Sequence, residues 1–271
     1  MGNGNSKENN RCDIYDYCSN SIQDCHKFEH PERYMPPFAA KWHRIIPESI
    51  EYPTARTGHF YSYYPNKDWA ITGCGATAQH SLFDDIWALD LKTFKWMRLN
   101  ITGSHISPRT GAKSTIIGDT LYVFGGFCDP VYFNELYAIN LTNFVCSKIE
   151  GTGDIPSPRN APLFSNYQDR LYVWGGYDGG WPSDLFVFDT HTNNWTKYPQ
   201  SATGRSGQTF ATIGQYIYCY MSAKSGGMYV VNMETNEVKQ YQTSGCEPED
   251  PNLLNAGLVP VDHYLFLLGG K

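Results

Sequence analysis

The chain carries the hexapeptide Leu121-Tyr-Val-Phe-Gly-Gly126 and, 50 residues later, its near copy Leu171-Tyr-Val-Trp-Gly-Gly176. Each is a run of aliphatic and aromatic residues that ends in a glycine pair, as is typical of a short β-strand followed by a tight turn. Weaker copies lie at 69–74, 217–222 and 265–270. Counted on positions 73, 125, 175, 221 and 269, the steps are 52, 50, 46 and 48 residues, which predicts a repeat.

The surroundings of the hexapeptides repeat as well. An arginine precedes each of the first four copies, at Arg56, Arg109, Arg159 and Arg205. A loop of variable length and then a third strand follow each copy, and the third strands are predicted at 86–90, 136–140, 185–189 and 228–232. Six residues further on, a fourth strand opens at Trp96, Cys146, Trp195 or Val238. Constant strand spacing beside variable loops separates a packed scaffold from a variable surface.

Composition agrees with a β-protein rich in turns. The 271 residues are 41% hydrophobic, 15% aromatic and only 18% charged, which excludes wholesale disorder and a long charged coiled coil. The net charge of −6 disfavours duplex nucleic acid as the main partner. The chain has no apolar run of about 20 residues, so we expect no helix that spans a membrane.

The recurring glycine pair, aromatic residues and period resemble the kelch repeat over residues 41–271. The resemblance implies an all-β, kelch-type β-propeller of four-stranded antiparallel blades, in which the repeated Trp fills the gaps between blades. Gly73-Cys74 and Met221-Ser222 depart from the glycine pair. Residues 41–45 resemble an outer strand and 265–270 belong to an inner pair, so we expect four complete blades plus partial blade strands. We favour a fragment of a six- or seven-bladed ring over a five-bladed ring that closes imperfectly.

The four repeated arginines are the first candidate site. Equivalent positions of a propeller form a ring at one end of its channel, where Arg56, Arg109, Arg159 and Arg205 would give a positive mouth that captures an acidic peptide. The resemblance adds that kelch domains often bind partner peptides at this mouth. The alternative is structural, because such an arginine can instead bind backbone carbonyls of the neighbouring blade.

The variable loops after the glycine pairs are the second candidate site. Their aromatic residues are suited to anchor a partner, and the candidates are Phe83, Phe127, Tyr132, Tyr177 and Trp181. The alternative is that these rings fold back over the tops of the blades. We expect Trp181, in a Gly-rich loop beside Pro182, to be exposed.

Residues 1–40 form a separate polar segment that contains Cys12, Cys18, Cys25 and His30. Three thiolates and an imidazole complete a tetrahedral zinc shell, and His26 competes with His30 as the fourth ligand. The metal would supply the folding energy of so short a segment. The segment 12–30 resembles both the Cys-Cys-Cys-His finger of RNA-binding proteins and the poly(ADP-ribose)-binding finger, in which a second His replaces Cys25. The alternative is that these cysteines are reduced and unstructured.

The amino terminus fits the N-myristoylation pattern, with Gly2 as the acceptor and Ser6 in place. A single myristoyl chain gives only weak, reversible membrane contact. The first thirty residues are polar, so we expect no secretory signal and a cytoplasmic protein, without excluding the nucleus.

We therefore expect a non-catalytic interaction scaffold that binds a partner protein through its loops and channel mouth. The alternative is a zinc-finger reader of RNA or poly(ADP-ribose) carried on a propeller platform. A propeller enzyme is the least favoured, because the histidines of the repeats share no equivalent position. His59 is the one histidine expected near the mouth.

Overall fold

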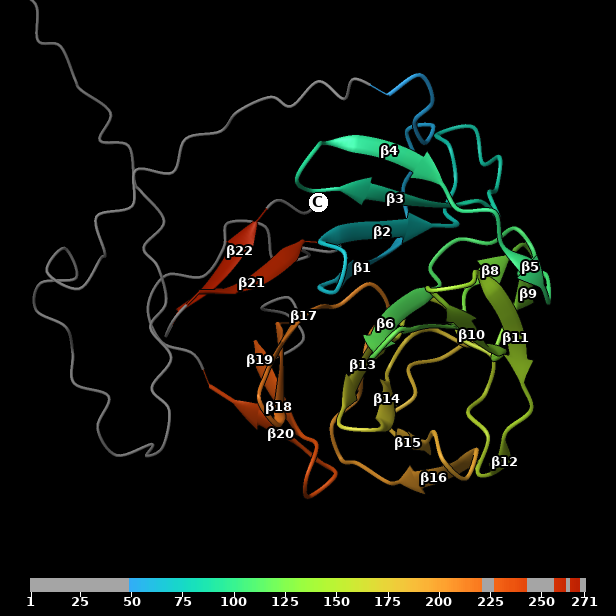
Figure 1. Cartoon of the computed structure of the whole chain (residues 1–271). Helices are drawn as coiled ribbons and strands as arrows, with labels where there is room; N and C mark the ends of the chain where they lie inside the picture. Colours follow the sequence, from blue (N-terminus) through green and yellow to red (C-terminus); the bar gives the residue numbers. More distant parts are fainter. Residues whose placement is uncertain (1–48, 221–226, 243–255, 262–263, 269–271) are drawn as a thin grey trace, which may run out of the picture.

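The computed structural model (Figure 1) describes residues 49–220, 227–242, 256–261 and 264–268. Every regular element in these ranges is a β-strand, so the predicted all-β class is confirmed. Four sheets follow one another around a common axis as the blades of a propeller (Figure 1), as predicted. Within the described ranges, no helix has the length and apolar character needed to cross a membrane.

Each blade is an antiparallel meander of four strands in chain order. Blade 1 contains β1 (Phe60–Tyr64), β2 (Trp69–Gly73), β3 (Ile86–Asp90) and β4 (Lys95–Arg98). Blade 2 contains β6 (Lys113–Ile117), β7 (Thr120–Phe124), β10 (Leu136–Asn140) and β11 (Val145–Ile149). Blade 3 contains β13 (Leu163–Tyr167), β14 (Arg170–Trp174), β15 (Leu185–Asp189) and β16 (Asn194–Tyr198). Blade 4 contains β17 (Thr209–Ile213), β18 (Tyr216–Tyr220), β19 (Met228–Asn232) and β20 (Glu237–Tyr241).

Among the described residues, six further strands lie outside the four-stranded meanders. The linkers that enter blades 2 and 3 add β5 (Thr102–Gly103) beside β11 and β12 (Thr152–Gly153) beside β16, both in parallel. A hairpin of β8 (Phe127–Cys128) and β9 (Val131–Tyr132) follows the glycine pair of blade 2. The strands β21 (Gly257–Val261) and β22 (Tyr264–Leu268) pair with each other, and β21 lies against β17.

The glycine pair of the first repeat is shifted by one residue from the prediction. Gly73 is the last residue of β2 and pairs with Phe60, so the turn is made by Cys74 and Gly75. Their φ angles of 58° and 93° match the 71° and 106° of Gly125 and Gly126. Cys74 therefore takes a left-handed conformation that costs a non-glycine residue about 1 kcal/mol or more, and the first step of the repeat is 51 residues rather than 52.

Aromatic residues fill the gap between blades 2 and 3, as the repeat predicts. Trp195 of β16 is buried and packs on Phe188 of its own blade, with ring centroids 4.8 Å apart. It also contacts Phe124 of blade 2 at 5.7 Å. Further buried hydrophobic clusters join blade 1 to blade 2 and blade 3 to blade 4. Both faces of blades 2 and 3 are therefore covered, so their loops are carried on a rigid base.

Several sequence predictions fall outside the described residues. These are Lys41–Ile45 as an outer strand, Met221-Ser222 and Gly269-Gly270. They also include the separate segment 1–40, with zinc ligands Cys12, Cys18, Cys25 and His30 and lipid acceptor Gly2.

Candidate functional site

The four segments that carry the repeated arginines are joined around the axis by backbone hydrogen bonds. The amide of Gly111 donates to the carbonyl of Gly58 at 2.7 Å, and the amide of Ala161 donates to Gly111 at 2.9 Å. The amide of Gly207 continues the series to Ala161 at 3.0 Å. Each donor lies two residues after its arginine, so this belt places the four arginine segments at one end of the propeller.

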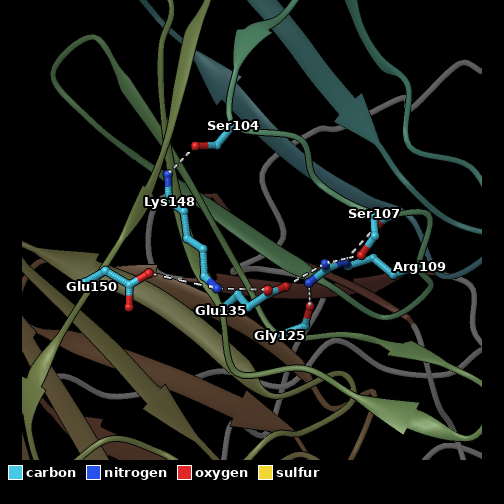
Figure 2. A network of polar contacts seen from close by, with 7 residues as sticks. All are labelled: Ser104, Ser107, Arg109, Gly125, Glu135, Lys148 and Glu150. Carbon is cyan, nitrogen blue, oxygen red and sulfur yellow. Dashed lines mark hydrogen bonds and ion pairs between the residues drawn. The ribbon is translucent and has the colours of Figure 1, made fainter.

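Arg109 is buried inside this end and is only 1% exposed. Figure 2 shows its guanidinium held from several sides. Nη1 donates to the carbonyl of Gly125 at 3.2 Å, while Nε donates to the carbonyl of Ser107 at 3.0 Å. Nη2 donates to Ser107 Oγ at 2.6 Å and to Glu135 Oε2 at 2.8 Å. The ring of Phe133 covers the guanidinium at 3.8 Å.

Arg159 repeats this arrangement in blade 3 and is also 1% exposed. Its Nη1 donates to the carbonyl of Gly175 at 2.9 Å, and its Nε donates to the carbonyl of Ser157 at 3.0 Å. Burial lowers the pKa of the Arg159 guanidinium to about 10, against the opposing charges of Asp178 and Asp184. In blade 1, Arg56 donates to the carbonyl of Cys74 at 3.1 Å.

These contacts support the structural alternative for the repeated arginine. The predicted partner was wrong in one respect: in three blades the guanidinium binds the carbonyl of the first residue in the glycine-pair turn of its own blade, not a carbonyl of the neighbouring blade. An arginine in this position ties the segment before the inner strand to the turn after the second strand. Arg109 and Arg159 could contact a partner only by leaving these buried hydrogen bonds, which would strand carbonyls without donors.

Carboxylates balance the positive charge expected at this end. Arg56 forms a two-pronged ion pair with Asp85, and Arg109 pairs with Glu135. Burial alone would raise the pKa of Glu135, but the hydrogen bond and charge of Arg109 hold it below its usual value. Lys148 Nζ lies 3.2 Å from the other oxygen of Glu135 (Figure 2). The acidic residues directly before the third strand therefore belong to the scaffold, a role that their repetition in the sequence could have indicated.

Four of the five predicted loop aromatics form a continuous row, here called the aromatic row: Phe127, Tyr132, Tyr177 and Trp181. Within the β8–β9 hairpin, the ring centroids of Phe127 and Tyr132 are 4.7 Å apart. Tyr132 meets Tyr177 of the next blade at 6.0 Å, and Tyr177 meets Trp181 at 4.9 Å. Trp181 is 45% exposed, as predicted, and the other three rings are half-buried.

The backbone fixes the row at two equivalent points. Phe127 exchanges a pair of backbone hydrogen bonds with Thr110, at 2.8 and 2.9 Å, and Tyr177 does the same with Asn160, at 2.8 and 3.0 Å. Thr110 and Asn160 directly follow Arg109 and Arg159, so the buried arginines and the aromatic row share one support.

The remaining two candidates lie differently. Phe83 is not part of the row, because its ring lies against the guanidinium of Arg56 at 4.0 Å, as Phe133 does against Arg109. Arg205 is half-buried, and its guanidinium lies over the ring of Trp181 at 4.9 Å. Among the described residues no carboxylate forms an ion pair with Arg205, so it extends the aromatic row with a positive end.

His59, the histidine expected near the mouth, is half-buried with an unbonded Nδ1. Burial lowers its pKa, and the charges of Arg56 and Lys113 add to that effect. In the part of the chain that the structure describes, no group of three or more His, Cys, Asp or Glu side chains could hold a metal ion.

Comparisons with known proteins agree with the fold. The family model described as "KLHDC2/KLHL20/DRC7 Kelch-repeats domain" matches residues 34–227. Host cell factor 2 of Homo sapiens is 26% identical over 144 residues, which is 47% of this chain and 17% of that protein.

Shorter matches include two plant proteins. Acyl-CoA-binding domain-containing protein 5 of Arabidopsis thaliana is 35% identical over 74 residues, which is 27% of this chain and 11% of that protein. The tRNA wybutosine-synthesizing protein 2/3/4 of the same plant is 32% identical over 76 residues, 28% of this chain and 7% of that protein. The chain thus spans less than a fifth of the length of each of these relatives.

Proposed function

The chain belongs to the kelch-repeat family, and from this we propose that it is a non-catalytic interaction scaffold that binds another protein on its aromatic row. Kelch propellers are generally non-enzymatic interaction scaffolds, which supports the general part of the proposal.

The aromatic row is the single observation that carries the proposal. Four rings from the loops of two blades touch in sequence, and the last of them, Trp181, is well exposed. Tyrosine and tryptophan combine a large apolar face with a polar edge and lose little conformational entropy on binding, so they are frequent anchors of protein interfaces.

The loops that carry the aromatic row are held rigidly by the fold. The ring-bearing loops are tied by backbone hydrogen bonds to the segments that Arg109 and Arg159 hold. A surface that is already ordered before binding loses less entropy when a partner docks. The buried arginines therefore serve binding indirectly, by keeping the row in place.

Affinity capture from the cell of origin tests the proposal. The bait is the full chain, compared with a Trp181→Ala/Tyr177→Ala double variant and a Tyr61→Ala control. Tyr61 is 68% exposed on β1, so its removal deletes exposed aromatic area outside the row. We expect the unmodified chain and the control to capture the same specific proteins and the double variant to lose them, at an unchanged melting temperature. Equal capture by all three would refute the row as the binding surface.

A further inference from the structure

We infer that the aromatic row takes an extended, basic segment of its partner, with proline or aliphatic side chains on the rings and lysine or arginine beside them. This inference rests on the proposed function and specifies the chemistry of the partner. It also differs from the acidic peptide that the repeated arginines predict.

The shape of the row selects an extended segment. Its rings contact one another in a single order, from Phe127 through Tyr132 and Tyr177 to Trp181. Successive centroids are 4.7, 6.0 and 4.9 Å apart. A polyproline II helix has three residues per turn and advances by about 9.3 Å per turn, so the side chains on one of its faces would meet about every second ring. Aromatic-lined surfaces recognise this conformation because it is ordered before binding.

The charged side chains within the two ring-bearing loops, residues 127–133 and 177–183, are both acidic. Asp129 lies at the exposed tip of the β8–β9 hairpin, between Phe127 and Tyr132 in sequence. Asp178 directly follows Tyr177 and is exposed. Neither carboxylate forms an ion pair with any described residue, so both remain available to a cation from outside.

Asp178 is held in place without being neutralised by a contact. One oxygen accepts from Ser157 Oγ at 2.7 Å, and the other accepts from the amide of Gly180 at 3.1 Å. These hydrogen bonds fix the direction of the carboxylate, and the charge of buried Arg159 acts on it only from inside the fold. A lysine or arginine of the partner would meet a carboxylate that is already oriented.

The repeated arginines are less accessible to a partner than these two carboxylates. Arg109 and Arg159 are buried and their guanidiniums donate to the blade itself, and Arg56 is paired with Asp85. Arg205 is the exception, because its guanidinium lies over Trp181. The row thus has two exposed carboxylates in its loops and one half-buried guanidinium. This balance of charge favours a basic segment.

Two labelled peptides test the inference by fluorescence anisotropy with the full chain. The first has nine residues that alternate proline and leucine, with lysine at both ends, and the second has glutamate in place of both lysines. We expect the lysine peptide to bind at least about twofold more tightly, since each of its two exposed ion pairs contributes about 1.4- to fivefold in affinity. Added salt should weaken the lysine peptide, because exposed charges are screened.

Three variants assign the effect to residues. The Asp129→Asn/Asp178→Asn variant should abolish the preference for lysine. Asparagine at position 178 can still accept from the amide of Gly180 through Oδ1 and can donate to Ser157 Oγ through Nδ2. Trp181→Ala should weaken both peptides. The control Glu237→Gln removes a carboxylate from the outer strand of blade 4 and should change nothing.

Tighter binding of the glutamate peptide, lost in an Arg205→Gln variant, would overturn the inference in favour of an acidic segment. Equal binding of the two peptides, or binding of neither, would overturn it as well. None of these outcomes decides the proposed function, which depends on whether the Trp181→Ala/Tyr177→Ala bait loses its cellular partner.

Discussion

Replacing Arg109 with alanine tests whether this residue stabilises the fold or contacts a partner. The change removes a guanidinium that is 1% exposed and donates to the carbonyl of Gly125, to Ser107 and to Glu135. The Gly125 carbonyl then lies in the interior without this donor, and an unsatisfied buried acceptor costs about 1–3 kcal/mol. The lost cover of Phe133 adds a packing deficit, because this ring loses a contact at 3.8 Å.

The total loss of folding free energy should be about 3–5 kcal/mol, the range for removing one partner of a buried ion pair. Glu135 contributes only part of this loss, because its side chain is partly exposed and keeps Lys148, and the unpaired Gly125 carbonyl and the lost Phe133 contact contribute the rest. At about 2–4 °C per kcal/mol for a chain of this size, the melting temperature should fall by roughly 6–20 °C. Differential scanning calorimetry measures both quantities.

Lys148→Ala is the matched control, because it removes a partner of the same carboxylate from an exposed position. Lys148 is 42% exposed, so its loss should cost less than about 1 kcal/mol. Partner binding per folded molecule should be unchanged in both variants. Melting temperatures that fall equally little in both, with binding lost only in Arg109→Ala, would refute the scaffold role and restore the mouth-binding role.

Three further predictions concern packing, charge and metal. Trp195→Ala should cost about 3–5 kcal/mol, because it empties the aromatic contact between blades 2 and 3, and an unchanged urea midpoint would contradict this. Lys113→Met should stabilise the fold by about 1–2 kcal/mol at neutral pH, since Lys113 opens β6 where β1 and β13 have Phe60 and Leu163. Burial lowers the pKa of Lys113 in the folded chain, so the unfolded chain binds the proton more tightly. The free energy of unfolding should therefore rise with pH between the lowered pKa of the folded chain and the ordinary lysine pKa of the unfolded chain. The Met variant should lack this rise. Elemental analysis should find about one zinc per chain through Cys12, Cys18, Cys25 and His30, and its absence from freshly reduced protein would reject the finger.

The blade architecture could be predicted from the sequence because four independent signals recur in order. The arginine, the glycine pair, the third strand and the residue six positions later all mark the same repeat, and Trp195 packs between blades as that repeat requires. The register of the first repeat could not be predicted. Gly73 resembles the first glycine of a pair, whereas the left-handed position falls on Cys74, which no residue preference would select.

The candidate surface could be predicted only in part. Loop composition identified Phe127, Tyr132, Tyr177 and Trp181, but sequence alone carries no information on which rings touch across two blades. Phe83 resembles them in sequence and instead lies against Arg56. The arginine repeat left both a binding role and a structural role open. The structure decides between them, because the guanidiniums donate to carbonyls of the glycine-pair turns, and the sequence does not show these contacts.

Site-specific photo-crosslinking tests the binding surface most directly. A benzophenone side chain is placed at one position per variant, as Trp181→p-benzoylphenylalanine or, for comparison, Tyr61→p-benzoylphenylalanine. Both positions are exposed, but only Trp181 belongs to the aromatic row. The account predicts that irradiation in the cell joins a specific partner protein to the chain from position 181 and not from position 61. A partner joined from position 61 and not from 181 would contradict it.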